Sequence, residues 1–233
     1  MTPKIGFEMT SKKGTLMAVP WNDITWVLLD MDGTLLDKHF DDYFWETLVP
    51  EEYARRQAMD LALARDLVFA RYQREEGTLN WTDIDFWSRE LELDIPALKE
   101  GIRHLIEVHP DTEGFLEFLR QKEKRVALVT NAHYKTLSLK MNHTGLLGYF
   151  DEVVSSFDLG HPKEAVRFWE ILHDRLHFDP SQVLLVDDNA EALAAAKTFG
   201  IKYPYFKAKS SSRQDAESHP DFFSIESFDE LRD

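Results

Sequence analysis

Acidic, amide and hydroxyl side chains lie at the ends of the apolar runs that the sequence predicts to be buried strands. The runs span residues 25–29, 125–129, 151–155 and 183–186, and the polar residues at their ends are Asp30 and Asp32, Thr130 and Asn131, Ser155 and Ser156, and Asp187 and Asp188. In open parallel sheets, ligands bind outside the carboxyl ends of the strands. Carboxylates that converge there would repel one another without a cation between them. The sequence therefore predicts a metal site.

This set of residues suits phosphoryl transfer. Oxygen ligands favour a hard cation, and Mg²⁺ is typically held by one or two carboxylates, waters and a substrate phosphate. Thr130, the backbone amides around it and Lys163 could bind that phosphate. An ionised Asp30 could then attack phosphorus in line while Asp32 protonates the leaving oxygen. We therefore expect Mg²⁺ as the cofactor and an aspartyl-phosphate as the intermediate.

The elements that must position these side chains alternate between helix and strand after His109-Pro110. Apolar periodicity and turn residues predict helices at 112–122, 134–144, 163–177 and 190–199, and strands at 125–129, 151–155, 183–186 and 201–206. Such alternation indicates right-handed crossovers between parallel strands. We expect an α/β fold with a doubly wound, Rossmann-like parallel sheet, in which Lys163 begins a helix.

Residues 41–108 have a different texture, with long helix-compatible stretches such as 51–74 and no strand-like alternation. They predict a helical cap inserted into a core of residues 20–40 and 109–233. Residues 1–19 have no sustained period and are expected to form a leader that could be disordered. Aromatic side chains are dense in the cap and should mostly form its own core, but Trp81, Phe86 and Trp87 are candidates to stack on a substrate base.

Composition narrows the choice of partners. The 27 Lys and Arg residues against 42 Asp and Glu residues give a net charge of −15, which disfavours a nucleic acid polymer. No run approaches the roughly 18 apolar residues that a membrane span needs. The chain has no cysteine, which excludes disulfides and thiol nucleophiles and fits a cytoplasmic location. A small phosphorylated metabolite fits, provided that a metal ion and Lys163 reverse the local field.

The chemistry-bearing segments also stand in a familiar order. Asp30-Met31-Asp32-Gly33-Thr34, Thr130-Asn131, Lys163 and Asp187-Asp188 resemble the four motifs of haloacid dehalogenase superfamily hydrolases. The resemblance covers most of the chain, including the helical cap between the first two motifs, which is similar to the subclass with an α-helical cap. It implies a Mg²⁺-dependent hydrolase with a Rossmann-like core.

The resemblance also implies a role for each motif residue. Asp30 would be the nucleophile and a metal ligand, and Asp32 the acid–base catalyst whose backbone carbonyl also binds the metal. Asp188 would bind the metal directly, with Asp187 beside it. Phosphate binding would fall to the remaining motif residues, which are Thr130, Asn131 and Lys163.

Within this superfamily, the residues around the motifs are similar to those of bacterial GMP/IMP nucleotidases. The segments that carry this likeness are residues 27–37, Tyr43-Phe44-Trp45, Leu79-Asn80-Trp81, Asp85-Phe86-Trp87, Thr130-Asn131-Ala132-His133 and Gly160-His161-Pro162-Lys163-Glu164. The likeness implies a nucleoside 5′-monophosphate, such as GMP or IMP, as the substrate.

Ordinary structural roles compete with these assignments. Thr130 and Asn131 could simply cap the following helix, and Lys163 could be a surface lysine. His133 could touch the phosphate region or only occupy the first turn of its helix. A second acidic pair, Asp83-Ile84-Asp85, lacks both a preceding strand and a following Gly-Thr. We therefore expect a capping or solvated role for that pair.

Other functions compete as well. A phosphatase of sugar phosphates would use the same chemistry, and only the cap aromatics favour a base over a sugar. A haloacid dehalogenase should lack the acidic cluster that includes Asp187-Asp188. A phosphoacceptor receiver domain would carry its acidic pair on the first strand, whereas here the pair comes last. A silent phosphate-binding protein should lack a catalytic position, and none is missing.

Overall fold

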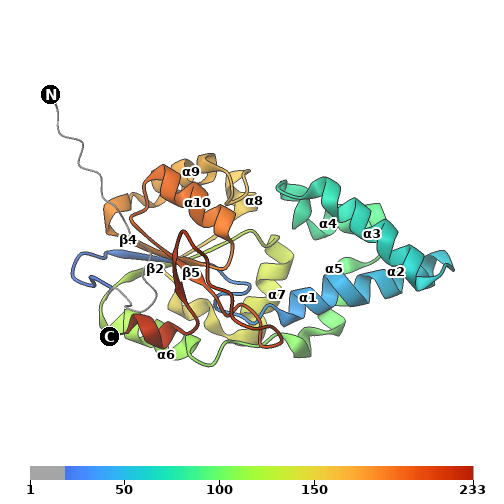
Figure 1. The fold of residues 1–233 in the computed structure, drawn as a ribbon, viewed down its shortest axis with the longest axis horizontal. Coiled ribbons are helices and arrows are strands. Elements are labelled where there is room, and N and C mark those ends of the chain that lie inside the picture. Colours follow the sequence, from blue (N-terminus) through green and yellow to red (C-terminus); the bar gives the residue numbers. More distant parts are fainter. Residues whose placement is uncertain (1–18, 233) are drawn as a thin grey trace.

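A six-stranded, fully parallel sheet forms the centre of the molecule in the computed structural model, which describes residues 19–232 (Figure 1). The strand order is β3-β2-β1-β4-β5-β6. The strands are β1 Trp26–Leu29, β2 Arg125–Thr130, β3 Glu152–Ser155, β4 Val183–Asp187, β5 Tyr203–Lys207 and β6 Phe223–Ile225. The order reverses between β1 and β4, so the expected doubly wound α/β fold is confirmed. The sixth strand was not expected, because its three residues are too few to show a period.

Strand β1 is buried on both faces, as its continuous apolar run predicts. Val27 and Leu29 belong to one hydrophobic cluster and Trp26 and Leu28 to another, because successive side chains of a strand point to opposite faces. Leu28 pairs in register with β2 on one side and β4 on the other. This central strand delivers Asp30 to the carboxyl edge of the sheet.

Helices cover both faces. On one face, α9 (Val166–Leu176) and α10 (Ala190–Phe199) bury their apolar sides in the cluster that contains Leu28. On the other face, α6 (Thr112–Gln121) and α7 (Tyr134–Thr144) contribute to the cluster that contains Val27. Figure 1 shows α9 and α10 on the side of the sheet opposite α6. The sequence predicted α6, α7 and α10 within one residue of their observed ends.

Between β1 and β2 the chain forms a helical segment over residues 39–105, which extends to one side of the sheet (Figure 1). Its helices are α1 His39–Tyr43, η1 Phe44–Leu48, α2 Val49–Gln57, α3 Leu61–Glu75, η2 Leu79–Trp81, α4 Ile84–Leu91, α5 Ile95–Gly101 and η3 Arg103–Leu105. The segment has a hydrophobic cluster of its own around Phe44, Val68 and Trp87. The domain limits expected at residues 41 and 108 stay a prediction.

Two expected helices begin or end elsewhere. The stretch 51–74 is divided between α2 and α3, because Ala58 adopts a left-handed conformation and Asp60 then caps α3. The helix expected at residues 163–177 begins only at Val166, after a short helix α8 (Ser156–Leu159). Lys163 therefore lies in a turn and not at a helix start.

The remaining short helices are η4 Leu146–Tyr149, η5 Pro180–Gln182 and η6 Phe228–Leu231. Val19, the last residue of the expected leader, is buried in the main cluster. The rest of the expected leader, residues 1–18, lies outside the described residues. Within residues 19–232, no helix combines the length and apolar character needed to cross a membrane.

The two-sided burial of β1 gives a stability prediction. Leu28→Ala should lower the free energy of unfolding by about 2–5 kcal/mol, because Leu28 is fully buried and its loss leaves a cavity. Leu61→Ala is the matched control, since Leu61 is 48% exposed and should change it by about 0.5 kcal/mol or less. Urea unfolding followed by circular dichroism measures both. Equal effects would contradict the burial pattern.

Candidate active site

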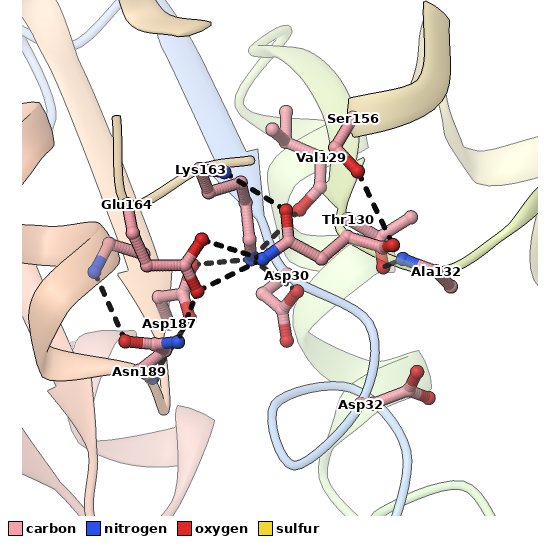
Figure 2. A network of polar contacts seen from close by, with 12 residues as sticks. Asp30, Asp32, Val129, Thr130, Ala132, Ser156, Lys163, Glu164, Asp187 and Asn189 are labelled. Carbon is pink, nitrogen blue, oxygen red and sulfur yellow. Dashed lines mark hydrogen bonds and ion pairs between the residues drawn. The ribbon is translucent and has the colours of Figure 1, made fainter. Parts of the chain in front are cut away.

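The ammonium of Lys163 lies at the centre of the polar groups at the carboxyl edge of the sheet (Figure 2). Its Nζ donates to Asp30 Oδ1 at 2.5 Å and Asp187 Oδ2 at 2.7 Å, and it lies 3.3 Å from the carbonyl of Val129. Lys163 is 2% exposed, so it is not a surface lysine. Although burial opposes it, the adjacent carboxylates of Asp187 and Asp30 raise the pKa of Lys163. The side chain therefore stays charged.

Asn131 holds the Lys163 turn in place. Its side-chain Oδ1 accepts from the backbone N–H of Lys163 at 3.0 Å, and its Nδ2 lies 3.0 Å from both carboxylate oxygens of Glu164. Asn189 donates to Glu164 from the other side at 2.7 Å. The carbonyl of Lys163 accepts from Trp169 Nε1 at 2.7 Å. Helix α9 starts only at Val166 because its N-cap residue, Ala165, has an extended backbone with ψ of 129°.

Thr130 and Asn131 do not cap the following helix. Thr130 Oγ1 accepts from the N–H of Ala132 at 3.1 Å, and the N-cap of α7 is His133, whose Nδ1 accepts from the N–H of Lys135. Thr130 is 2% exposed and lines the cavity described below. Its hydroxyl hydrogen is therefore available to a ligand in that cavity.

Three carboxylates crowd this edge of the sheet. Oxygen atoms of Asp30, Asp187 and Asp188 all lie within 4.8 Å of one another. Burial and the neighbouring Asp187 carboxylate raise the pKa of Asp30 to about 7, although Lys163 opposes the shift. The pKa values of Asp187 and Asp188 are raised as well, chiefly by burial. An all-oxygen cluster with this excess of negative charge fits a hard cation, and these three residues could hold one.

Gly33 leaves the space that Asp188 occupies. A Cβ atom at Gly33 would lie 2.1 Å from Asp188 Oδ2, and the φ angle of Gly33 is +79°. Asp187 has both oxygens engaged, by Lys163 and by the backbone N–H of Asn189. Asp188 is only half-buried, so its carboxylate is the more accessible of the pair. The direct metal-binding role expected for Asp188 stays a prediction.

Asp32 lies apart from the Lys163 group (Figure 2) and has a different cation. Lys140 Nζ of α7 donates to Asp32 Oδ1 at 2.5 Å and also binds Asp41 of α1. Burial raises the pKa of Asp32 to about 6, although Lys140 opposes the shift. Sequence reasoning missed Lys140 and Asp41, because neither belongs to a motif. The only signal was a lysine between Leu139 and Met141, on a helix with a weak apolar period.

A cavity of about 720 Å³ joins these residues to the helical segment. Its walls include Asp30, Asp32, Thr130, Asn131, His133, Lys163, Asp187 and Asp188, and aromatic side chains from the helical segment, namely Trp45, Phe69, Tyr72, Trp81 and Trp87. Every predicted site residue is thus brought together except Phe86, which is not part of the lining. Phe86 packs against Trp87 and the cluster of the helical segment instead.

Most of the cavity aromatics contact one another edge to face, whereas Phe69 is stacked on Tyr72. The Tyr72 ring lies 5.0 Å from Trp87 and 6.2 Å from Trp81, both nearly perpendicular to it. Trp87 is 1% exposed and therefore supports the wall, whereas Trp81 is 42% exposed. Trp81 has the ring surface that a planar ligand could cover. The sequence singles out neither Tyr72 nor Trp45 among the aromatic residues of the cap.

His133 lies where α7 meets the helical segment. Its Nε2 is 3.8 Å from Asp83 and 3.9 Å from Asp85, and Lys135 forms an ion pair with Asp85 at 2.6 Å. Asp83 accepts from two backbone N–H groups as the N-cap of α4, which confirms the expected capping role for Asp83, whereas Asp85 pairs with Lys135. His133 thus occupies the helix start and also lines the cavity.

Comparison with known proteins places this geometry in a family. The family described as haloacid dehalogenase-like hydrolase matches residues 24–200. The chain belongs to the haloacid dehalogenase-like hydrolases. Each motif that carried the expected resemblance lies within or at the edge of the cavity. The family is one of hydrolases that typically use a metal ion, in agreement with the acidic cluster.

Relatives within the family differ in their substrates. The chain is 39% identical to GMP/IMP nucleotidase YrfG of Escherichia coli strain K12, over 79% of this chain and 83% of the relative. It is 23% identical to a phosphorylated carbohydrates phosphatase of Thermotoga maritima, over 77% and 83%. A crystal structure of a haloacid dehalogenase-type phosphatase from Thermococcus onnurineus has a TM-score of 0.76 at 26% identity, covering 90% of this chain and 96% of that one.

The contact between Gly33 and Asp188 predicts a metal-binding defect. Gly33→Ala should weaken the binding of a divalent cation, because the new Cβ displaces Asp188. Gly145→Ala is the matched control: Gly145 also has a positive φ, of +73°, but no atom lies within 4 Å of a Cβ built there. Both variants should lose stability through backbone strain, and only Gly33→Ala should lose affinity in calorimetric titration. Equal affinities would contradict the prediction.

The raised carboxyl pKa values predict a link between pH, metal and stability. Asp30 titrates near 7 in the folded protein instead of at 3.8, so the folded state holds a proton that the unfolded chain has lost. Stability of the metal-free protein should therefore fall as pH rises through this window. A divalent cation replaces the proton and should raise Tm more at about pH 8 than at about pH 5. Thermal unfolding with EDTA or cation measures this; equal shifts at both pH values would refute it.

Proposed function

We propose that this protein is a Mg²⁺-dependent phosphomonoesterase that hydrolyses purine nucleoside 5′-monophosphates such as GMP and IMP. The observation that carries the proposal is the placement of Asp30, Lys163 and Thr130 at one end of a cavity whose other end is lined by aromatic rings. One end offers groups for a phosphate and the other a surface for a base. The 39% identity to a nucleotidase supports the choice of substrate.

Asp30 is the nucleophile of the proposed reaction. One carboxylate oxygen forms a bond to phosphorus as the bond from phosphorus to the leaving oxygen breaks. Lys163 holds Asp30 in a fixed orientation and, with the Thr130 hydroxyl, offers charge and a hydrogen-bond donor to the phosphoryl oxygens. Mg²⁺ would compensate the charge of the phosphoryl group. The residues that would hold the ion are Asp30, Asp187 and Asp188.

Asp32 is the general acid and then the general base of the proposed reaction. Its carboxyl gives a proton to the leaving oxygen, so the nucleoside departs as an alcohol. It then takes a proton from water, whose oxygen bonds to phosphorus and releases Asp30 as a carboxylate together with inorganic phosphate. A pKa near 6 suits both directions of transfer near neutral pH. The side chain is partly exposed to the cavity, so it can reach a bound substrate.

The helical segment would supply the contacts to the base. Trp45, Tyr72 and Trp81 offer ring faces and edges, and the exposed Gln73 of α3 offers an amide that could donate to the carbonyl shared by guanine and hypoxanthine. A closed segment would also exclude water during phosphoryl transfer. The net charge of −15 supports a small substrate over a nucleic acid polymer. A cytoplasmic location stays a prediction from composition.

Sugar phosphates are the second candidate substrates. The catalytic residues would act in the same way, and one relative is named a phosphorylated carbohydrates phosphatase. The identity to that relative is 23%, against 39% to the nucleotidase. The aromatic wall also favours a planar base. We therefore rank purine nucleotides first.

Phosphate release from a panel of nucleoside monophosphates and sugar phosphates tests the proposal. Wild type with Mg²⁺ should prefer GMP and IMP, and EDTA should abolish release. Asp30→Asn should lower kcat at least about 10³-fold, because the amide is a poor nucleophile. Asp174→Asn, a change at a carboxylate that is 77% exposed, is the control and should leave kcat unchanged. Faster turnover of sugar phosphates would overturn the substrate assignment, and full activity of Asp30→Asn would overturn the mechanism.

A further inference from the structure

We propose that Lys140 is a positioning residue for Asp32, and that Asp41 and Lys99 connect this pair to the helical segment. The inference rests on the proposed phosphomonoesterase function and extends it to residues outside the motifs. Four side chains of alternating charge form a continuous series, Asp32–Lys140–Asp41–Lys99. The series joins the loop after β1, helix α7, helix α1 and helix α5.

Lys140 is fixed by contacts on several sides. Its ammonium donates to Asp32 and to Asp41, and it lies 4.9 Å from the centre of the Phe40 ring. The residue is 1% exposed, so it has no path to bulk water as an alternative partner. A lysine in this setting has one orientation, and it imposes that orientation on Asp32.

Asp32 needs such a partner more than the other site carboxylates do. Asp30 and Asp187 are held by Lys163 inside the sheet edge and are almost completely buried. The Asp32 side chain is 27% exposed and faces the cavity, so several rotamers are open to it. Among the described residues, Lys140 is the only one with a side-chain hydrogen bond to Asp32.

The series continues to the wall of the cavity. Asp41 accepts from Lys99 Nζ at 2.9 Å, and Lys99 is 2% exposed. The Lys99 ammonium lies 4.4 Å from the centre of the Phe44 ring and 5.3 Å from that of Trp45. Trp45 and Lys99 line the cavity. The orientation of the proton donor is thereby tied to the helices that would hold the rest of the substrate.

A purely structural role for Lys140 is the competing explanation. Lys207 shows what such a role looks like, because it is also 1% exposed and its ammonium donates to the backbone carbonyls of Lys209 and Glu226. Lys207 makes no ion pair within the described chain. The ammonium of Lys140 instead donates to Asp32, the acid–base residue, and to Asp41 of the helical segment. The two lysines make a matched pair for experiment.

The consequence is a defect that depends on the leaving group. When Lys140 is lost, Asp32 populates several rotamers and fewer molecules have its proton near the leaving oxygen. Breaking the bond from phosphorus to a basic leaving oxygen requires that proton, whereas a good leaving group departs as an anion without it. A general loss of stability would lower both reactions by one factor.

Two aryl phosphates, phenyl phosphate and 4-nitrophenyl phosphate, test this inference. Lys140→Met should lower kcat/KM for phenyl phosphate by about 10²-fold and should lower kcat/KM for 4-nitrophenyl phosphate far less. Lys140→Arg should recover part of the loss, because its guanidinium can also reach Asp32. Asp41→Asn, which removes the second carboxylate without removing Lys140, should show the same selectivity with a smaller loss. Lys207→Met should lower both reactions by one factor.

A double variant completes the test. Asp32→Asn should show the same selectivity, and adding Lys140→Met to it should cause no further change in the ratio of the two reactions. Circular dichroism establishes which variants are folded, and the ratio in Asp41→Asn and Lys140→Arg serves if Lys140→Met does not fold. Equal losses for both substrates in a folded variant would overturn the role of Lys140. Wild type inactive on both esters and also on GMP and IMP would instead overturn the proposed function.

Discussion

One buried lysine between two carboxylates determines how the rest of this site is built. Lys163 is almost fully enclosed, and removing a charge from water is costly unless opposite charges meet it. Asp30 and Asp187 meet that need, so the ends of β1 and β4 and the turn before α9 must come together at the ammonium. Asn131, Glu164 and Asn189 extend the same requirement to the loops. The carboxyl edge of the sheet therefore has little freedom.

The sheet edge could be predicted from sequence because its determinants are local. A four-residue apolar strand followed by Asp30 and Asp32 specifies both burial and exit point, and the same holds for β4 and Asp187. The start of α9 could not be predicted, because Lys163 is held in a turn by Asn131, 32 residues away, and the extended backbone of Ala165 delays the helix to Val166. Strand β6 could not be predicted either, because three residues are too few to show an alternating pattern.

The contribution of the helical segment was less predictable still. Aromatic residues cluster so closely there that helical phase could not separate core from cavity. Phe86 turned inward to the cluster around Trp87, whereas Tyr72 and Trp45 reached the cavity wall. Lys140 belongs to no motif, and its importance appears only when α1 and α7 are seen side by side through Asp41. Long-range ion pairs of this kind leave no trace in sequence spacing.

Two ion pairs join the helical segment to α7, and they differ in their exposure to solvent. Lys135 and Asp85 are 43% and 33% exposed, whereas Lys140 is 1% exposed beside Asp41. Dissolved salt screens exposed charges over about 10 Å at 0.1 M but reaches buried ones poorly. Rising ionic strength should therefore loosen the outer contact while the inner one persists. The contact of α7 with the helical segment should therefore depend at high salt mainly on the pair of Lys140 with Asp41.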